Sequence, residues 1–233
     1  MNKQSNVYTV IYIIIMVVVV GVALAFTAMS LKDRQNDNVA ADKMRQIISS
    51  LRIAPQQDVK AQFAQVITDQ YLVNSQGERI NGDAFAVNIA NEIKKPAAER
   101  QLPVYEAHLA DGSLKYIIPV YGAGLWGPIW GYVALDDDAS TIYGAFFNHE
   151  GETPGLGAEI TKDAFSSQFQ GKQMFKNGEL LPVAVVKAGQ APTNGADYVD
   201  GISGGTITSK GVSAMLADCF APYNAFLQSI RNK

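Results

Sequence analysis

The sequence predicts an α+β protein in which a single N-terminal transmembrane helix precedes a domain with an antiparallel sheet and flanking helices. Three observations support this fold class. A stretch of 28 residues between Lys3 and Lys32 carries no charge, whereas 40 of the 41 charged residues follow it. Segments rich in β-formers and joined by short turns occupy the middle of the chain. Segments with helical spacing of apolar residues lie before and after them, as in an α+β domain.

The N-terminal span covers residues 10–29, which contain no charge. At about 1.5 Å per residue a helix of this length spans about 30 Å, the thickness of a bilayer core. We assign residues 1–31 as a membrane anchor. A cleaved signal peptide is the alternative, because Ala23-Leu24-Ala25 is an acceptable cleavage site, but the apolar run is longer than the usual signal core. A buried core helix is disfavoured, because nothing nearby could cover it on all sides. Charges on the two sides of the span do not settle its orientation.

The next part of the chain, residues 32–100, is predicted to be a helical stalk and the beginning of the soluble domain. A helix is expected over residues 33–53, ended by Pro55, and a second over residues 58–71. Residues 73–100 carry little signal apart from a turn at Asn81-Gly82-Asp83.

Two strand pairs follow. Residues 104–109 and 114–121 flank the turn Asp111-Gly112, and residues 129–135 and 141–148 flank an acidic turn. A further strand is expected over residues 183–187. The last predicted helix covers residues 209–230, with Thr208 or Ser209 as its N-cap and a break or kink at Pro222.

Composition excludes several functional classes. From Lys32 onward the chain has 18 Lys and Arg against 22 Asp and Glu, a net charge of −4, so we expect no nucleic-acid partner. The single cysteine, Cys219, excludes an internal disulfide and a cysteine-ligated metal cluster. Two histidines offer little for a metal site. We expect no bound metal.

Three glycine-rich segments are candidate sites, and we call them the first, second and third. They cover residues 122–127, 151–157 and 200–209. Each alone is compatible with an ordinary turn. The third leads directly into the last predicted helix, whose free N–H groups and positive dipole end favour a phosphate. It is not a P-loop, because GxxxxGK[ST] is absent.

The third segment resembles the flavinylation motif Asp-x-x-Ser-Gly-Ala-Thr, in which FMN is joined through its phosphate to the final threonine. Asp200, Ser203, Gly204 and Thr206 match it, and Gly205 stands where the motif usually has alanine. By this resemblance Thr206 is the acceptor. Since glycine is also small, we expect the motif to remain functional.

The other two segments narrow the resemblance. The runs Tyr116–Trp126 and Gly151–Gly157, together with Gln168, Gly171-Lys172 and the stretch 208–212, are similar to the NqrC family, which supplies one subunit of the Na⁺-translocating NADH:quinone oxidoreductase. The RnfG subunit of the Rnf ferredoxin:NAD⁺ oxidoreductase, which shares the FMN-binding domain, is the alternative. The Gly-Leu-Trp-Gly run favours the quinone-reducing complex. The resemblance makes residues 101–233 an FMN-binding domain.

The resemblance implies a function, a route of maturation, a location and a set of cofactor residues. The chain would be an electron-transfer subunit without catalytic residues of its own, docked among the other subunits of its complex. A separate flavin transferase using FAD and Mg²⁺ would attach the FMN. The flavin domain would lie on the periplasmic side of a bacterial inner membrane. The residues expected at the cofactor are Thr206, Ser203, Gly204, Gly205, Thr208, Gly124, Leu125, Trp126, Glu152, Thr153, Pro154, Gly155, Leu156, Gly157 and Asp200.

The sequence leaves the roles of Trp126 and Glu152 open. Trp126 either packs on the isoalloxazine ring or is a core tryptophan beside Trp130. Glu152 either contacts the flavin or caps a turn. Two other functions remain as alternatives: a non-catalytic anchored scaffold subunit, and a hydrolase using Ser209 or Thr206, for which the sequence supplies no base.

Overall fold

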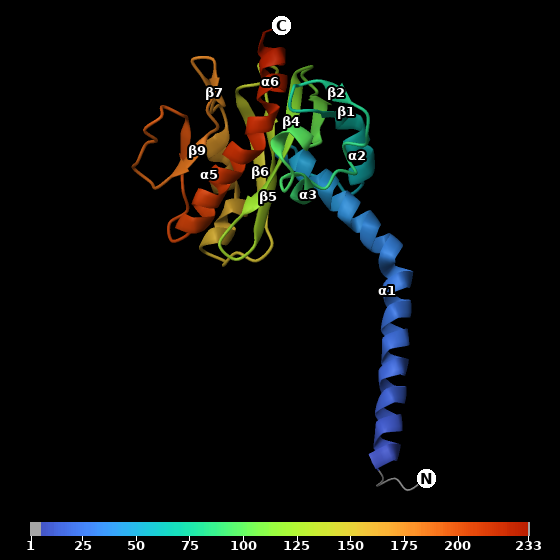
Figure 1. Cartoon of the computed structure of the whole chain (residues 1–233). Helices are drawn as coiled ribbons and strands as arrows, with labels where there is room; N and C mark the ends of the chain where they lie inside the picture. The colour runs from blue at the N-terminus through green and yellow to red at the C-terminus, as the bar shows by residue number, and fades with distance from the viewer. Residues whose placement is uncertain (1–5, 233) are drawn as a thin grey trace. The chain divides into compact units, whose positions relative to one another are not determined.

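The computed structural model describes residues 6–232 (Figure 1). Its α-helices are α1 (Asn6–Ser50), α2 (Val59–Val66), α3 (Ile89–Glu92), α4 (Asp163–Ser166), α5 (Thr206–Phe220) and α6 (Asn224–Arg231). Its 3₁₀ turns are η1 (Ala97–Glu99), η2 (Gly157–Thr161), η3 (Ser167–Phe169) and η4 (Ala221–Tyr223). Its strands are β1 (Ile67–Val73), β2 (Arg79–Ile80), β3 (Leu102–His108), β4 (Leu114–Ala123), β5 (Pro128–Leu135), β6 (Ile142–His149), β7 (Phe175–Lys176), β8 (Glu179–Leu180), β9 (Ala184–Val186) and β10 (Tyr198–Asp200).

The chain divides into two compact units, residues 1–43 and residues 44–233. Most of α1 makes up the first unit. This helix is long and apolar enough to cross a membrane, and none of its most apolar stretch is buried. The alternative of a core helix is therefore excluded, and the helix is consistent with a membrane anchor. Residues 1–5, where the predicted anchor begins, and Lys233, where the predicted FMN-binding domain ends, lie outside the described residues.

The second unit is built on a six-stranded antiparallel sheet with the order β2-β1-β3-β4-β5-β6. Both predicted strand pairs are confirmed. In the first pair His108 lies opposite Leu114 across the turn at Gly112, whose φ of +82° suits glycine. In the second, Leu135 lies opposite Ile142 after a bulge. The antiparallel sheet with flanking helices confirms the predicted α+β class.

The main core lies on the sheet face covered by α5, α6 and the 157–169 segment. Fully buried side chains there include Ile118, Val133, Phe165, Phe169 and Leu216. The predicted break at Pro222 is confirmed, since α5 ends at Phe220 and the chain continues through η4 into α6. Removing this apolar surface from water, at about 25 cal/mol per Å², provides the main stabilisation of the unit.

The end of α1, residues 44–50, packs on another part of the same sheet. Ile47 and Ile48 are fully buried there, and the indole N–H of Trp130 donates to Oε1 of Gln46. Gly144 on β6 allows this contact, because a Cβ at that position would collide with the carbonyl oxygen of Ser50. The apolar span and residues 44–50 thus belong to one uninterrupted helix, α1.

Three sequence predictions are wrong in detail. The helix expected over residues 58–71 ends at Val66, and residues 67–73 form β1, whose pairing with β3 outweighs local helical spacing. The strand expected over residues 183–187 is only β9, and it pairs in parallel with β10. Neither Thr208 nor Ser209 is the N-cap of α5. Gly205 occupies that position, and both hydroxyl residues lie inside the first turns of the helix.

Candidate functional site

The three glycine-rich segments meet at a buried carboxylate. Glu152, in the second segment, is 5% exposed. Its Oε1 accepts a hydrogen bond of 2.8 Å from the backbone N–H of Trp126, in the first segment. Its Oε2 accepts one of 2.5 Å from the hydroxyl of Thr208, in the third. One side chain thus holds three loops that are distant in sequence.

The environment of Glu152 favours its ionised form. Burial alone would raise the pKa, but hydrogen bonds from the Thr208 hydroxyl and from the backbone N–H groups of Trp126 and Leu125 outweigh it. The pKa of Glu152 therefore lies below its ordinary value. The backbone N–H of Glu152 also donates to Nδ1 of His149, 3.1 Å away. Both carboxylate oxygens of Glu152 accept hydrogen bonds within the protein, so the structure favours a structural role over contact with the flavin, and that role is to join three loops rather than to cap one turn.

Glycine is required where the segments approach this carboxylate. A Cβ on Gly157 would collide with Oε2 of Glu152 and with Oγ1 of Thr208. A Cβ on Gly124 would lie 2.5 Å from Oε1 of Glu152. Two of the glycines that suggested ligand contact in the sequence therefore serve the contact between loops.

The third segment is fixed from both ends. The backbone N–H of Asp200 donates to Oε1 of Gln168 at 2.9 Å, and the backbone N–H of Ile202 donates to Oγ of the buried Ser209 at 2.9 Å. Gly204 has a φ of +76°, which suits glycine. Gln168 and Ser209 were not among the residues expected at the cofactor, although Ser209 was considered as an N-cap and as a hydrolase nucleophile. The resemblance included Gln168, but nothing in the sequence indicated which backbone it would bind.

Thr206 is the first residue of α5, and its side chain is exposed. No side chain caps this end of α5, so its first backbone N–H groups are available to an anion. Ser203 and Gly204 are exposed as well, whereas Gly205 is buried. The predicted acceptor is therefore accessible at the positive end of a helix.

A cavity of about 360 Å³ adjoins Thr206. Ser203, Gly204 and Ser209 line it, together with the exposed side chains of Lys187 and Lys210. Two cations beside a helix N-terminus suit a phosphate. Lys187 was missed by sequence reasoning, because it follows a three-residue strand and only the fold brings it to Thr206.

Apolar side chains surround the same place. In the described part of the second unit, the large hydrophobic residues that are exposed are Leu125, Trp126, Leu156, Tyr198 and Ile207. Four of these five belong to the glycine-rich segments. Trp126 is 69% exposed, so the alternative of a core tryptophan is wrong. Thr153, Pro154 and Gly155, also predicted at the cofactor, are exposed in the second segment. Such a surface suits a planar aromatic ligand.

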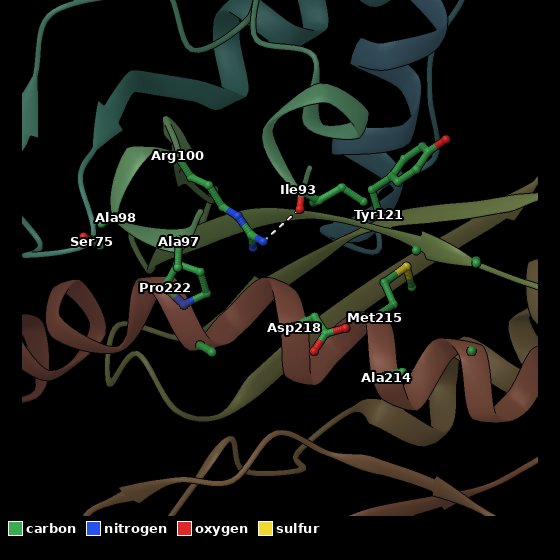
Figure 2. A pocket seen from close by; sticks show the side chains of 14 residues that line it. Ser75, Ile93, Ala97, Ala98, Arg100, Tyr121, Ala214, Met215, Asp218 and Pro222 are labelled. Carbon is green, nitrogen blue, oxygen red and sulfur yellow. Dashed lines mark hydrogen bonds between the residues drawn. The ribbon is translucent and has the colours of Figure 1, made fainter. Parts of the chain in front are cut away.

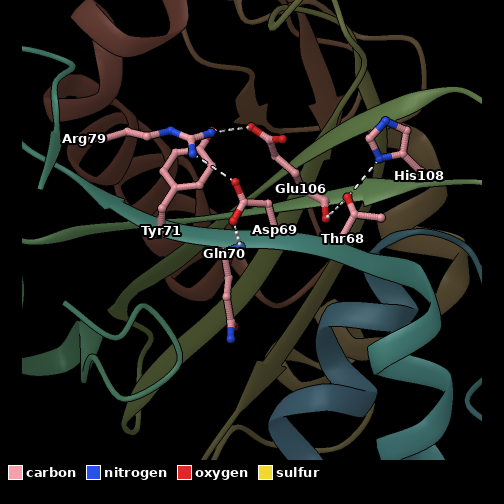
Figure 3. Close-up of polar contacts among 7 residues, drawn as sticks. All are labelled: Thr68, Asp69, Gln70, Tyr71, Arg79, Glu106 and His108. Atoms are coloured by element: carbon pink, nitrogen blue, oxygen red, sulfur yellow. Dashed lines mark hydrogen bonds and ion pairs between the residues drawn. The ribbon is translucent and has the colours of Figure 1, made fainter. Parts of the chain in front are cut away.

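Two other features of the second unit lie apart from Thr206, although the first of them is lined in part by Gly122 and Ala123 of the first glycine-rich segment. A larger cavity, of about 840 Å³, lies between α5 and residues 93–100 (Figure 2). A polar cluster on β1, β2 and β3 centres on Arg79, which stacks 3.5 Å from the ring centre of Tyr71 and forms ion pairs with Asp69 and Glu106 (Figure 3). This cluster ties the short edge strand β2 to the sheet. Among the described residues no group of His, Cys, Asp and Glu side chains could hold a metal ion.

Comparison with known proteins agrees with this geometry. The FMN-binding domain family matches residues 124–221, which include the second and third glycine-rich segments and the first from Gly124 onward. The NqrC subunit of the Na⁺-translocating NADH-quinone reductase of Vibrio anguillarum is 32% identical over 91% of this chain and 89% of its own length. That of Pseudomonas aeruginosa is 30% identical over 99% and 98%.

Solved structures give the same answer. The crystal structure of the corresponding reductase subunit from Parabacteroides distasonis is 48% identical, with a TM-score of 0.79, over 84% of this chain and 96% of that one. NqrC of Shewanella oneidensis is 26% identical, with a TM-score of 0.68, over 84% and 100%. These relatives all bear the name of the quinone-reductase subunit rather than that of the Rnf alternative. The chain thus belongs to the NqrC family of Na⁺-translocating NADH-quinone reductase subunits, and it contains the FMN-binding domain of this oxidoreductase subunit.

Proposed function

We propose that the chain is a covalently flavinylated electron carrier, with FMN attached through its phosphate to Oγ1 of Thr206. The single observation that carries this proposal is the position of Thr206: an exposed hydroxyl at the uncapped start of α5, in the matching motif, beside a cavity lined by Lys187 and Lys210. The phosphate would sit near the first N–H groups of α5, in the cavity that Lys187 and Lys210 also line.

The surrounding residues fit the rest of the group. Leu125, Trp126, Leu156 and Ile207 offer apolar surface for the isoalloxazine ring. FMN supplies the redox chemistry once it is bound, and the protein supplies its position and electrostatics. Glu152 would act indirectly, because it holds together the loops that carry Trp126 and Thr208.

Attachment requires a separate transferase using FAD and Mg²⁺. Among the described residues no hydrogen-bond partner prepares the Thr206 hydroxyl as a nucleophile, so activation has to come from another protein. Oγ1 of Thr206 would attack the flavin-bearing phosphorus of FAD. The pyrophosphate P–O bond would break, AMP would leave, and the hydroxyl proton would pass to the transferase. Exposure of Thr206 before assembly would make this step possible.

We also propose that residues 1–31 hold the domain at a bacterial inner membrane, with the domain on the periplasmic side. The carrier would then exchange electrons with cofactors of neighbouring subunits. An impermeant maleimide tests the side. Glu179, exposed on β8, becomes the label site in Glu179→Cys, while the native Cys219 is buried. Labelling in intact cells is expected, and labelling only after lysis contradicts the orientation.

Intact mass and in-gel flavin fluorescence of the full-length protein test the attachment. Wild type should carry one added FMN, and Thr206→Ala should carry none. Thr161→Ala removes an exposed hydroxyl that is not among the residues expected at the cofactor, and it should keep the flavin. Fluorescence retained in Thr206→Ala would show that the acceptor is another residue.

A further inference from the structure

We propose that the larger cavity is a docking groove for an amphipathic helix of a neighbouring subunit. One wall is α5, and the other is the segment from Ile93 through η1 to Arg100 (Figure 2). The end of β4 lies between them. The volume is about 840 Å³, more than twice that of the cavity beside Thr206. Docking at this groove does not require the flavin to be covalently attached.

Small residues on both walls leave room for a helix. Gly211, Ala214 and Ala221 lie on one face of α5 and its continuation, and Ala97 and Ala98 lie across from them. All four alanines are exposed. Helices packed through small side chains approach each other to about 8 Å. An amphipathic helix recognises such a groove through its apolar face.

Two charged residues of the groove, Arg100 and Asp218, determine which groups a bound helix must present to them. Arg100 uses Nε and one terminal nitrogen to bind the carbonyl oxygens of Lys95 and Ile93, and its remaining N–H groups are free to bind an acceptor. Asp218, on the α5 wall, has no hydrogen bond or ion pair within the described residues, and it does not pair with Arg100. Covering either charge without a partner would be costly.

The occupant must therefore present a basic side chain to Asp218 and an acceptor, such as a carboxylate, to Arg100. A polypeptide can carry both groups on one helix, one or two turns apart. A lipid tail or a quinone ring fills apolar space but supplies no cation for Asp218. Charge complementarity thus favours a protein helix.

The groove also leads to the electron-carrying site. At one end Gly211 lies against Ala123, since a Cβ on Gly211 would collide with the carbonyl oxygen of Ala123. Gly124, next along the chain, contacts the Glu152 carboxylate. A helix docked here would therefore end beside the first glycine-rich segment, at the edge of the proposed flavin site. This position suits a subunit that exchanges electrons with the carrier.

Tryptophan substitutions in the assembled complex test the groove. Ala214→Trp fills it from α5, and Ala98→Trp fills it from the other wall. Ala217→Trp, at an exposed position of α5 outside the groove, is the matched control. The complex is purified from detergent-solubilised membranes through a tag on this chain. We expect recovery of the neighbouring subunits to fall about tenfold with both groove variants, equivalent to a loss of about 1.4 kcal/mol in association, and to stay unchanged with the control.

Melting of each full-length variant separates docking from folding. If Ala214→Trp does not fold, Ala98→Trp alone decides. Asp218→Lys, which reverses the charge without filling the groove, should also lower recovery. Full recovery with a folded groove variant overturns the proposal, and so does equal loss with Ala217→Trp. Intact assembly with a loss only of quinone reduction would identify a small-molecule site instead. Flavin fluorescence, recorded in parallel, reports on covalent attachment independently.

Discussion

The hydroxyl of Thr208 donates a 2.5 Å hydrogen bond to Oε2 of Glu152, across 56 positions of sequence. The other oxygen of the same carboxylate accepts from the backbone N–H of Trp126. Because Thr208 lies two residues after Thr206, this bond ties the proposed attachment site to both of the other loops. The position of Thr206, the proposed acceptor, thus depends on Glu152, which is not expected to touch the flavin phosphate.

Removing the carboxylate should destabilise the protein. In Glu152→Ala the Thr208 hydroxyl and the Trp126 N–H lose their partner in a buried place. Each unsatisfied group costs about 1–3 kcal/mol, so we expect a loss of about 2–6 kcal/mol in the free energy of unfolding. Thermal melting of the full-length protein in detergent measures this. Glu150→Ala, at an exposed neighbouring position, should change stability by less than about 0.5 kcal/mol. Equal effects of the two changes would contradict the role of Glu152.

The same carboxylate should make stability depend on pH. The folded pKa of Glu152 lies below its ordinary value of 4.5, so the folded state binds fewer protons than the unfolded state in this range. Its contribution is therefore complete above about pH 4.5 and is lost as pH falls through the folded pKa. The melting temperature of wild type minus that of Glu152→Gln should be largest near neutral pH and shrink toward pH 3.

This difference isolates Glu152. The pKa values of Glu92, Asp138 and Asp197 are also lowered, but these groups contribute equally to both proteins. A gap that stays constant from pH 7 to pH 3 would show that the charge of Glu152 is not what stabilises the loops.

Gly157 should not tolerate a side chain. A Cβ there would overlap both partners of the hydrogen bond between Glu152 and Thr208, and neither can move without breaking it. We expect Gly157→Ala to cost about 1–3 kcal/mol and to lower flavin incorporation. Gly151→Ala is the control, because its Cβ would meet nothing closer than 4.0 Å and its backbone is not in the left-handed region. Melting temperature and flavin content of both variants measure the effect, and matching values would exclude a steric cause.

Much of the fold could be predicted because its signals are local. Charge segregation indicated the anchor, and alternating strands around Gly112 and around the acidic turn indicated the centre of the sheet. The error at residues 67–71 has a non-local cause. Their apolar spacing also fits a helix, and only pairing with β3, more than 30 residues later, makes them a strand.

The candidate site could likewise be predicted only in part from the sequence. The glycine-rich segments and Thr206 could be selected from the sequence, with the help of the family resemblance. The roles of single residues could not. Glu152 organises loops through partners 26 and 56 residues away, and Lys187 reaches the cavity from a separate two-stranded sheet. These contacts depend on tertiary structure, which sequence spacing does not encode.

Gly205 is the place where this chain departs from the usual motif, and its neighbour explains the departure. A Cβ on Gly205 would lie 3.1 Å from both Cβ and Cγ2 of Ile202. The φ of Gly205, −103°, would allow alanine, so the constraint is steric, and one of the two close atoms of Ile202, Cγ2, belongs to its β-branch. Gly205→Ala should therefore cost about 1 kcal/mol in the background of Ile202.

The same substitution should cost less in the background of Ile202→Leu, because leucine lacks the methyl group on Cβ and keeps only the contact of Cβ itself. A double-mutant cycle of the two changes, measured by melting temperature, should give a coupling of about 0.5 kcal/mol in that direction. Zero coupling, with Gly205→Ala equally harmful in both backgrounds, would place the constraint on Cβ of residue 202 or on the backbone nitrogen of Gly157, which lies 3.3 Å from the same Cβ position. The cycle thus decides whether the β-branch of Ile202 is what disfavours alanine at position 205 of the third glycine-rich segment.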